Sequence, residues 1–167
     1  SQLINRINSD LANSYGNLFQ RVISMILKNC NEAIPIRPND FQDEDLKLIN
    51  SIRNSLQNYR SLMDEQKFDQ FLKNIWLVIS DANKYVDNQA PWSLKKNDFQ
   101  RMEVVLYTLI ETIRQISIML QPFIPNTSKS ILDHIQIPLV KRDIKSIELF
   151  FEGGIQISTP KPLFPRV

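Results

Sequence analysis

Three side chains at four-residue spacing have the chemistry to hydrogen-bond to a nucleic-acid base. Asn13, Asn17 and Arg21 occur in a segment whose apolar residues step by three and four, so the sequence places all three on one helix face, turned away from the apolar stripe. Amide and guanidinium groups present paired donors and acceptors to base edges, whereas a merely solvated face tends toward Glu and Lys. We call this face the polar ridge. The alternative is an ordinary wet helix face.

A tryptophan and a small basic cluster follow between two long apolar-periodic segments. The stretch "DNQAPWSLKK", residues 87–96, carries Trp92 directly after a proline, and Lys95, Lys96 and Arg101 gather behind it. Unpaired RNA bases are held by stacking on aromatic rings and by hydrogen bonds to their edges, while basic residues bind the backbone. The polar ridge, Trp92 and the two lysines supply those three parts. Spacing alone does not show that they converge in space.

Signatures of catalysis and of metal binding are missing from the sequence. It contains no glycine-rich phosphate loop, no HExxH, no CxxC and no Glu-x-x-His pair of the di-metal bundle type. A single histidine, His134, and a single cysteine, Cys30, do not make a metal-ligand set and are interpreted as structural. We therefore predict a domain that binds rather than catalyses, with no catalytic residue and no metal site.

Apolar periodicity predicts an all-α fold, a helical bundle of about five helices. These are expected over residues 3–29, from Asp43 to Met63, from Phe68 to Val86, from a cap at Asn97 or Asp98 to Leu120, and over "NTSKSILDHIQI" with Asn126 or Thr127 as its cap. Pro91 interrupts the third helix, and Pro122 and Pro125 end the fourth. Trp76, one position beyond Ile75 in the third helix, is expected to be a core aromatic, in contrast to an exposed Trp92.

After residue 137 the pattern changes. The segment "IELFFEGGIQIS" is expected to form a small turn at Gly153 and Gly154 between two extended pieces, and "TPKPLFPRV" carries three prolines that exclude regular structure. We therefore divide the chain into a helical bundle over residues 1–136 and an irregular Pro-rich C-terminal extension over residues 137–167.

Composition restricts the classes of function. With 167 residues, 43% of them hydrophobic and 23% charged, the chain fits one compact domain with a core of its own. The apolar stretches fall short of the roughly 18 residues of a spanning helix, and no charged n-region with an apolar h-region is present, so we expect a cytoplasmic protein. A formal net charge of only +2 means that any nucleic-acid site must be local.

Several of these segments together resemble a known family. They are "NSDLANSYGNLFQR" (8–21), "ANKYVDNQAPWSLKK" (82–96), "RMEVVLYTLIETIRQISIMLQPFIPNTSKSIL" (101–132) and the ending "KPLFPRV". In order along the chain they resemble the C-terminal anticodon-binding domain of bacterial methionyl-tRNA synthetase, a class I aminoacyl-tRNA synthetase, and the combination of Asn-x-x-x-Arg with Ala-Pro-Trp is specific to that enzyme among class I synthetases. The resemblance implies a helical bundle that receives the CAU anticodon of methionine tRNAs.

The resemblance also implies roles for individual residues. Asn17 and Arg21 would contact the first anticodon base, and Trp92 would stack in the anticodon loop. Asn13 and the two lysines that follow Trp92 are predicted as auxiliary RNA contacts. The expected partner is therefore a methionine tRNA anticodon stem-loop, with no DNA and no membrane.

A longer enzyme is implied as well, one that attaches methionine to tRNA using ATP with Mg²⁺. In the family its catalytic half carries HIGH-like and KMSKS-like signatures and a zinc-binding insert, none of which occurs here. We therefore expect this chain to be a non-catalytic C-terminal part without a cofactor. Its own catalytic domain would be a second partner, toward which residues 137–167 return.

Two alternatives stay open at this point. A protein-interaction bundle would need no RNA site and would carry an apolar exposed stripe on its first helix instead of amides and an arginine. The anticodon-binding domain of a sister class I synthetase would share the bundle but should lack the paired Asn17/Arg21 and Pro91-Trp92 motifs.

Overall fold

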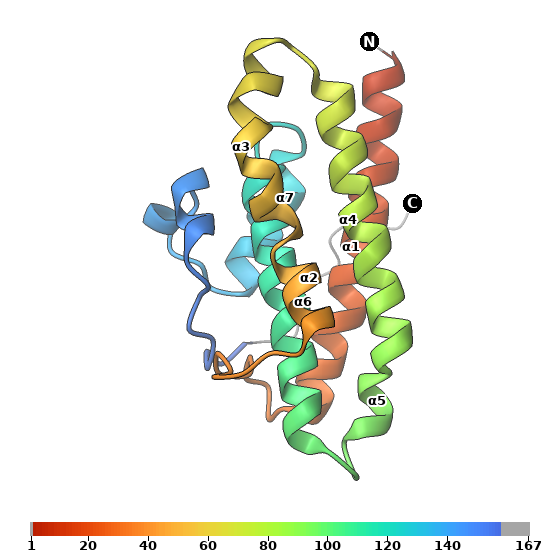
Figure 1. Ribbon diagram of the computed structural model, residues 1–167, viewed down its shortest axis with the longest axis vertical. Helices are drawn as coiled ribbons and strands as arrows, with labels where there is room; N and C mark the ends of the chain where they lie inside the picture. Colours follow the sequence, from red (N-terminus) through yellow and green to blue (C-terminus); the bar gives the residue numbers. More distant parts are fainter. Residues whose placement is uncertain (1, 158–167) are drawn as a thin grey trace.

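The chain folds as an elongated bundle of helices (Figure 1). The computed structural model describes residues 2–157, with side chains from residue 5 onward except residue 7. In this range the elements are α1 (Gln2–Asn29), α2 (Asp43–Ile49), α3 (Ser51–Asp64), α4 (Phe68–Gln89), α5 (Pro91–Leu94), α6 (Phe99–Met119), α7 (Pro125–His134) and the 3-10 helices η1 (Leu139–Lys141) and η2 (Ile144–Glu148). The predicted all-α bundle is confirmed. None of the helices described here combines the length and hydropathy needed to cross a bilayer.

The central element of the bundle is α6. Every residue from 105 to 120 is buried, and α1, α2, α4, α5 and α7 all pack against this helix. A helix that is buried on all sides must satisfy its polar groups internally. The hydroxyls of Thr108, Thr112 and Ser117 do so by donating to carbonyls four residues earlier, at 2.7–2.8 Å. The other helices pack around α6, which is the central helix of the bundle.

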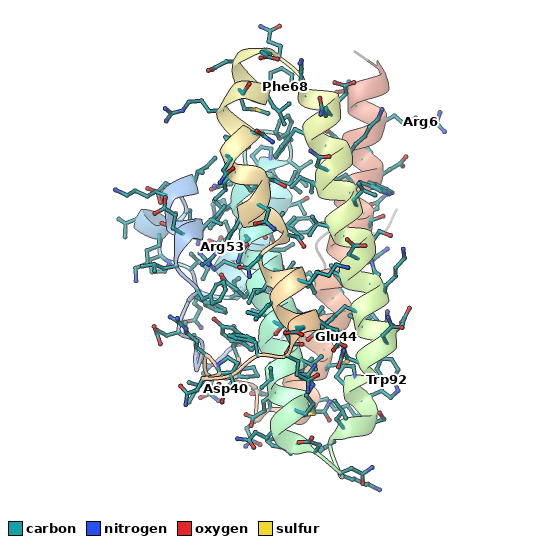
Figure 2. All side chains as sticks on the ribbon, viewed as in Figure 1. Arg6, Asp40, Glu44, Arg53, Phe68 and Trp92 are labelled. Atoms are coloured by element: carbon teal, nitrogen blue, oxygen red, sulfur yellow. The ribbon has the colours of Figure 1, made fainter. Side chains whose placement is uncertain are left out.

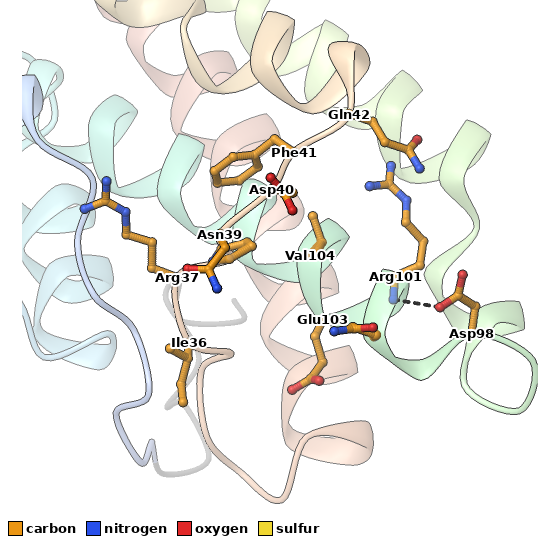
Figure 3. A pocket seen from close by; sticks show the side chains of 12 residues that line it. Ile36, Arg37, Asn39, Asp40, Phe41, Gln42, Asp98, Arg101, Glu103 and Val104 are labelled. Carbon is orange, nitrogen blue, oxygen red and sulfur yellow. Dashed lines mark hydrogen bonds between the residues drawn. The ribbon is translucent and has the colours of Figure 1, made fainter.

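The second predicted helix is two helices in the structure. Instead of one helix from Asp43 to Met63, the structure has a helix break at Asn50, which is both the C-cap residue of α2 and the N-cap residue of α3. Both helices pack on α4 and α6, α2 mainly on α6 and α3 mainly on α4. At the start of α6 the predicted capping by Asp98 is confirmed, because its side chain accepts the Arg101 backbone N–H at 3.1 Å (Figure 3).

The predicted caps of α7 are wrong. Neither Asn126 nor Thr127 caps this helix, which begins one residue earlier at Pro125, with Ile124 in the cap position and no side-chain hydrogen bond there. Proline suits the first helical position because its fixed φ is helical and the N–H that it lacks would have no partner inside the helix.

The end of the described chain pairs with the segment that follows α1. Backbone hydrogen bonds join Ile34 to Gly154 and Ile155, Arg37 to Glu152, and Ile157 to Glu32, at 2.7–2.9 Å. The turn predicted at Gly153 and Gly154 is not observed, because the chain pairs with residues 32–37 before and after these glycines without reversing direction. Both glycines have positive φ, 69° at Gly153 and 71° at Gly154. A Cβ atom at Gly153 would lie 2.1 Å from the carbonyl oxygen of Pro35, so only glycine fits there. The predicted irregular end, residues 158–167, lies outside the described residues.

Two arginines bind residues 146–149 to the helical bundle. The Arg114 side chain forms a buried ion pair with Glu111 at 2.5 Å and also donates to the carbonyls of Ser146 and Leu149, at 3.2 and 2.9 Å. From α3, Arg53 donates to the carbonyls of residues 147 and 148, at 3.1 and 2.7 Å. Side chains of α3 and α6 thus satisfy the backbone carbonyls of residues 146–149.

A second buried ion pair joins α2 and α6, with α4 as a third participant. The carboxylate of Asp45 is fully buried and accepts two hydrogen bonds from the Arg101 guanidinium, at 2.7 and 2.9 Å. It also accepts the Tyr85 hydroxyl at 2.5 Å and the Gln42 backbone N–H at 2.9 Å. Burial alone would raise the pKa of Asp45, but the hydrogen bonds from Arg101, Tyr85 and Gln42 outweigh it and hold this pKa below its usual value.

Because the folded-state pKa of Asp45 is lowered, its ionisation stabilises the fold above its unfolded pKa of about 3.9, and this contribution is lost as the pH falls through the lower folded value. We expect Asp45→Asn to lower the free energy of unfolding at pH 7 by about 3 kcal/mol, since Arg101 loses its buried partner. Denaturant unfolding should show this difference narrowing below about pH 4.

The exposed Asp43 in the same helical turn provides the control for this measurement. Asp43→Asn should stay within about 0.5 kcal/mol of the unsubstituted chain. A destabilisation by Asp45→Asn that is equally large at pH 3 and pH 7 would contradict the assigned pKa direction.

Candidate nucleic-acid interface

The polar ridge lies on the solvent side of α1. Asn13, Asn17 and Arg21 are exposed, while the apolar side of the same helix is buried in the core. At 1.5 Å rise per residue, Asn17 precedes Arg21 by about one turn and Asn13 by about two. The predicted orientation of these three side chains is observed. Helices α1 and α4 run side by side and in the same direction (Figure 1).

Trp92 is held outside the core by a sharp corner in the chain. The corner follows α4, where Ala90 adopts the left-handed conformation at φ 46° and ψ 60°, and the buried Pro91 then starts the short helix α5. The ring of Trp92 remains 51% exposed and projects from the outer side of α5 (Figure 2). Proline suits the first position of a helix, so Pro91 begins α5 directly after Ala90, and the side chain of Trp92 that follows it faces solvent.

Arg21 links the polar ridge to Trp92. Its guanidinium donates to the Asp87 carboxylate of α4 at 2.8 Å, and its central carbon lies 5.6 Å from the centroid of the Trp92 ring, within cation–π range. The Arg21 side chain is still 41% exposed, and its other N–H groups make no hydrogen bond within the described part of the chain. A guanidinium has five donors, so most of them are available to a ligand.

The two lysines stay accessible, whereas Arg101 does not. Lys95 and Lys96 are exposed in the turn between α5 and α6, three and four residues after Trp92. Arg101 was grouped with them in the sequence, but its guanidinium is occupied by Asp45 and Gln89. The basic cluster beside Trp92 therefore comprises two side chains, not three.

The prediction that Trp76 is a core aromatic is wrong. It is 39% exposed, because the buried stripe of α4 runs through Ile75 and Ile79, and the residue after Ile75 is rotated by about 100° toward solvent. Both tryptophans thus have exposed rings. Trp92 has a guanidinium within cation–π range, while Trp76 has no such contact among the described residues.

Asp87 is the site residue that sequence analysis missed. It belongs to the same stretch as Trp92, but nothing in the sequence points to its pairing with Arg21, because the two residues are 66 positions apart and meet only through the packing of α1 on α4. By accepting a hydrogen bond from one guanidinium nitrogen, Asp87 favours the position of Arg21 near the Trp92 ring.

Other reactive-looking side chains are engaged elsewhere. The Cys30 thiol is half-buried, and burial, with the nearby Glu103 carboxylate, raises its pKa to about 11, so it stays protonated. The Nδ1 atom of His134 lies 2.7 Å from the Ser130 carbonyl, and the ring meets Phe19 edge-on at 6.0 Å. Within residues 2–157 no group of three His, Cys, Asp or Glu side chains is arranged to hold a metal ion.

A polar hollow of about 620 Å³ lies away from Trp92, between the loop of residues 36–42 and the start of α6 (Figure 3). Its lining contains neither Arg21 nor Trp92 nor any part of the polar ridge. The candidate interface is therefore an open surface, with a flat aromatic ring beside a guanidinium and amides one and two turns away. Such a surface suits an unpaired base, which offers one face for stacking and one edge for hydrogen bonds.

Comparisons with known proteins identify the family of the chain. The family described as "Anticodon binding domain of methionyl tRNA ligase" matches residues 36–167. Methionine–tRNA ligase of Brucella suis is 39% identical over 98% of this chain, and that of Rickettsia typhi is 35% identical over all of it, with 32% and 34% of those two proteins covered. The chain therefore spans about a third of the length of the curated relatives it matches.

Solved structures give the same result. The apo form of Mycobacterium tuberculosis methionyl-tRNA synthetase matches with a TM-score of 0.87 at 34% identity, over 98% of this chain and 34% of that chain. The same enzyme in complex with methionyl-adenylate matches with a TM-score of 0.89 at 34% identity, over 99% of this chain and 33% of that chain. Since the family match covers most of this sequence, and the relatives extend the similarity through α1, the chain belongs to the family of methionyl-tRNA ligase anticodon-binding domains.

Proposed function

We propose that this chain recognises the CAU anticodon of methionine tRNAs, as the anticodon-binding domain of a longer enzyme that attaches methionine to tRNA. The observation that supports it most directly is the meeting of Arg21 with the exposed Trp92 ring, 5.6 Å apart. This pairing places a stacking surface and hydrogen-bond donors at one point of the bundle, as recognition of an unpaired base requires.

In this proposal the first anticodon base stacks on Trp92 while its edge faces α1. The Watson–Crick edge of cytosine has two acceptors and one amino donor. Arg21, held by Asp87, donates to the acceptors, and the side-chain carbonyl of Asn17 accepts from the amino group. Asn13 and the two lysines after Trp92 supply auxiliary contacts to the rest of the loop.

The rest of the proposal concerns the longer enzyme. ATP with Mg²⁺ belongs to its catalytic half, and this chain contributes tRNA binding alone. We keep the division into a bundle over residues 1–136 and an extension over residues 137–167 that returns toward the catalytic domain. A cytoplasmic location follows from a role in charging tRNA. The amides and arginine of the polar ridge disfavour the protein-interaction alternative, and the relatives, which are named for methionine, disfavour a sister synthetase.

The direct test compares two anticodon stem-loops that differ only in the first anticodon base. Uracil replaces the amino donor of cytosine by a carbonyl acceptor, so the stem-loop with UAU should bind about 1 to 3 kcal/mol more weakly than the one with CAU. Filter binding or calorimetry with the 167-residue chain measures the difference. Equal affinity for the two stem-loops would refute anticodon recognition.

Replacing Trp92 tests the stacking surface. Trp92→Ala should weaken binding of the CAU stem-loop by about 1 to 3 kcal/mol, the usual value of one base–aromatic stack. The free energy of unfolding should change by no more than about 0.5 kcal/mol, because the ring is largely exposed.

Trp76→Ala is the matched control, since it removes the other exposed tryptophan, which lies in α4. It should leave stem-loop affinity unchanged. If Trp92→Ala binds RNA as well as the unsubstituted chain does, or if it unfolds much more readily, stacking on Trp92 is not the mechanism.

Salt dependence tests the size of the charged footprint. Lys95 and Lys96 are the cationic side chains assigned to the RNA backbone, since Arg21 is paired with Asp87 and assigned to the base, so log K should fall with log[salt] with a slope of about 1.4, at roughly 0.7 per neutralised phosphate. Replacing both lysines by alanine should reduce the slope by about 1.4. A slope that reports six or more phosphate contacts would place the RNA on a different surface.

A further inference from the structure

The corner that presents Trp92 contains an unfavourable backbone conformation. Ala90 occupies the left-handed region at φ 46° and ψ 60°, which residues with a Cβ atom seldom adopt. Local hydrogen bonds close the corner, since the Ala90 carbonyl accepts both the backbone N–H and the hydroxyl of Ser93, at 2.9 and 2.7 Å. A conformation of this kind persists only where surrounding contacts hold it in place.

Gln89, the last residue of α4, connects this corner to two other helices. Its side-chain carbonyl accepts a hydrogen bond from the Arg101 guanidinium of α6 at 2.9 Å. Its amide group reaches Glu44 of α2 at 3.4 Å. Gln89 precedes Trp92 by three residues, so these contacts act at the point where the chain turns out of α4.

Arg101 is itself fixed in position. Both of its terminal nitrogens bind the Asp45 carboxylate, and the nitrogen that lies 2.9 Å from Asp45 is the one that also reaches Gln89. The Arg101 side chain is 12% exposed and points from α6 toward Gln42 and the start of α2 (Figure 3). A bidentate pair with a buried carboxylate leaves the guanidinium one orientation.

We infer that Gln89 and Arg101 are positioning residues for Trp92, which tie the corner between α4 and α5 to the buried Asp45 and so hold the ring ready for stacking. The inference rests on the proposed function only in what the held ring is for. A ring fixed before binding loses less conformational freedom when a base stacks on it, and affinity gains accordingly. A purely structural role for the same contacts would stabilise the fold without affecting the Trp92 ring.

The first arm of the test needs no RNA. In a Trp76→Phe background Trp92 is the sole tryptophan, so fluorescence anisotropy and acrylamide quenching report on its ring alone. Gln89→Ala removes the connection to the corner but keeps the Asp45–Arg101 pair. We expect lower anisotropy and stronger quenching for Gln89→Ala than for the control Gln70→Ala, the same substitution at an exposed position near the other end of α4. Gln89→Glu keeps an acceptor for Arg101 but would face Glu44 with a second carboxylate, so it is combined with Glu44→Gln, and this pair of substitutions should keep the anisotropy of the unsubstituted residue.

The second arm measures binding of the CAU stem-loop at a temperature where circular dichroism shows every variant folded. Gln89→Ala should bind about 2- to 10-fold more weakly than Gln70→Ala, the effect of leaving one binding side chain to be ordered on association. The loss of affinity in Gln89→Ala should be present even if its denaturant midpoint equals that of Gln70→Ala.

Two results would overturn the inference. One is an anisotropy and quenching of Trp92 in Gln89→Ala equal to those in Gln70→Ala, and the other is an altered ring mobility with unchanged stem-loop affinity. If the unsubstituted chain does not distinguish CAU from UAU, the proposed function fails instead. In that case the RNA-free arm alone decides whether Gln89 holds the corner.

Discussion

An ionised carboxylate that is buried away from water must be paired with hydrogen-bond donors and an opposite charge, and this requirement fixes the geometry around Asp45. Its partners come from the loop before α2, from Tyr85 near the end of α4 and from Arg101 at the start of α6. Because the desolvation of an unpaired charge costs several kcal/mol, the three elements have to meet at one point. The end of α4 is thereby placed against the start of α6, and the chain that joins them must reverse direction within the nine residues 90–98. The exposed corner with Trp92 follows from that constraint.

The long helices could be predicted from the sequence because each has a continuous apolar stripe, and periodicity records which face is buried. Local features were harder. The break at Asn50 carries no proline or glycine signal, and it separates α2, which packs mainly on α6, from α3, which packs mainly on α4. The start of α7 was placed one residue late, since the proline that ends the preceding pattern also opens the new helix. Trp76 was assigned to the core on hydrophobicity, although its position lies beside the buried stripe of α4 and not within it.

The candidate site divides in the same way. Four-residue spacing was enough to place Asn17 and Arg21 on one solvent face, and the interruption at Pro91 was enough to expect an exposed Trp92. The approach of Arg21 to the ring depends on how far α1 is shifted along α4 where the two helices pack. No local sequence pattern indicates this shift, because the two helices are far apart in the chain. The same holds for Asp87, and for Arg101, whose charge looks available in the sequence but is neutralised by a residue 56 positions earlier.

The shared direction of α1 and α4 has an electrostatic consequence. Both helices point their carbonyl ends toward the end of the bundle where Trp92 lies (Figure 1). Each macrodipole places a partial negative charge of about half a unit there. Only α1 offsets it in its last turn, with Lys28, while α4 has no basic residue in that position. The positive end of the α6 dipole and the side chains of Lys95 and Lys96 lie at this same end and oppose that partial negative charge. The site therefore attracts phosphate groups less strongly than its two lysines alone would, and binding there depends more on the neutral faces and edges of bases.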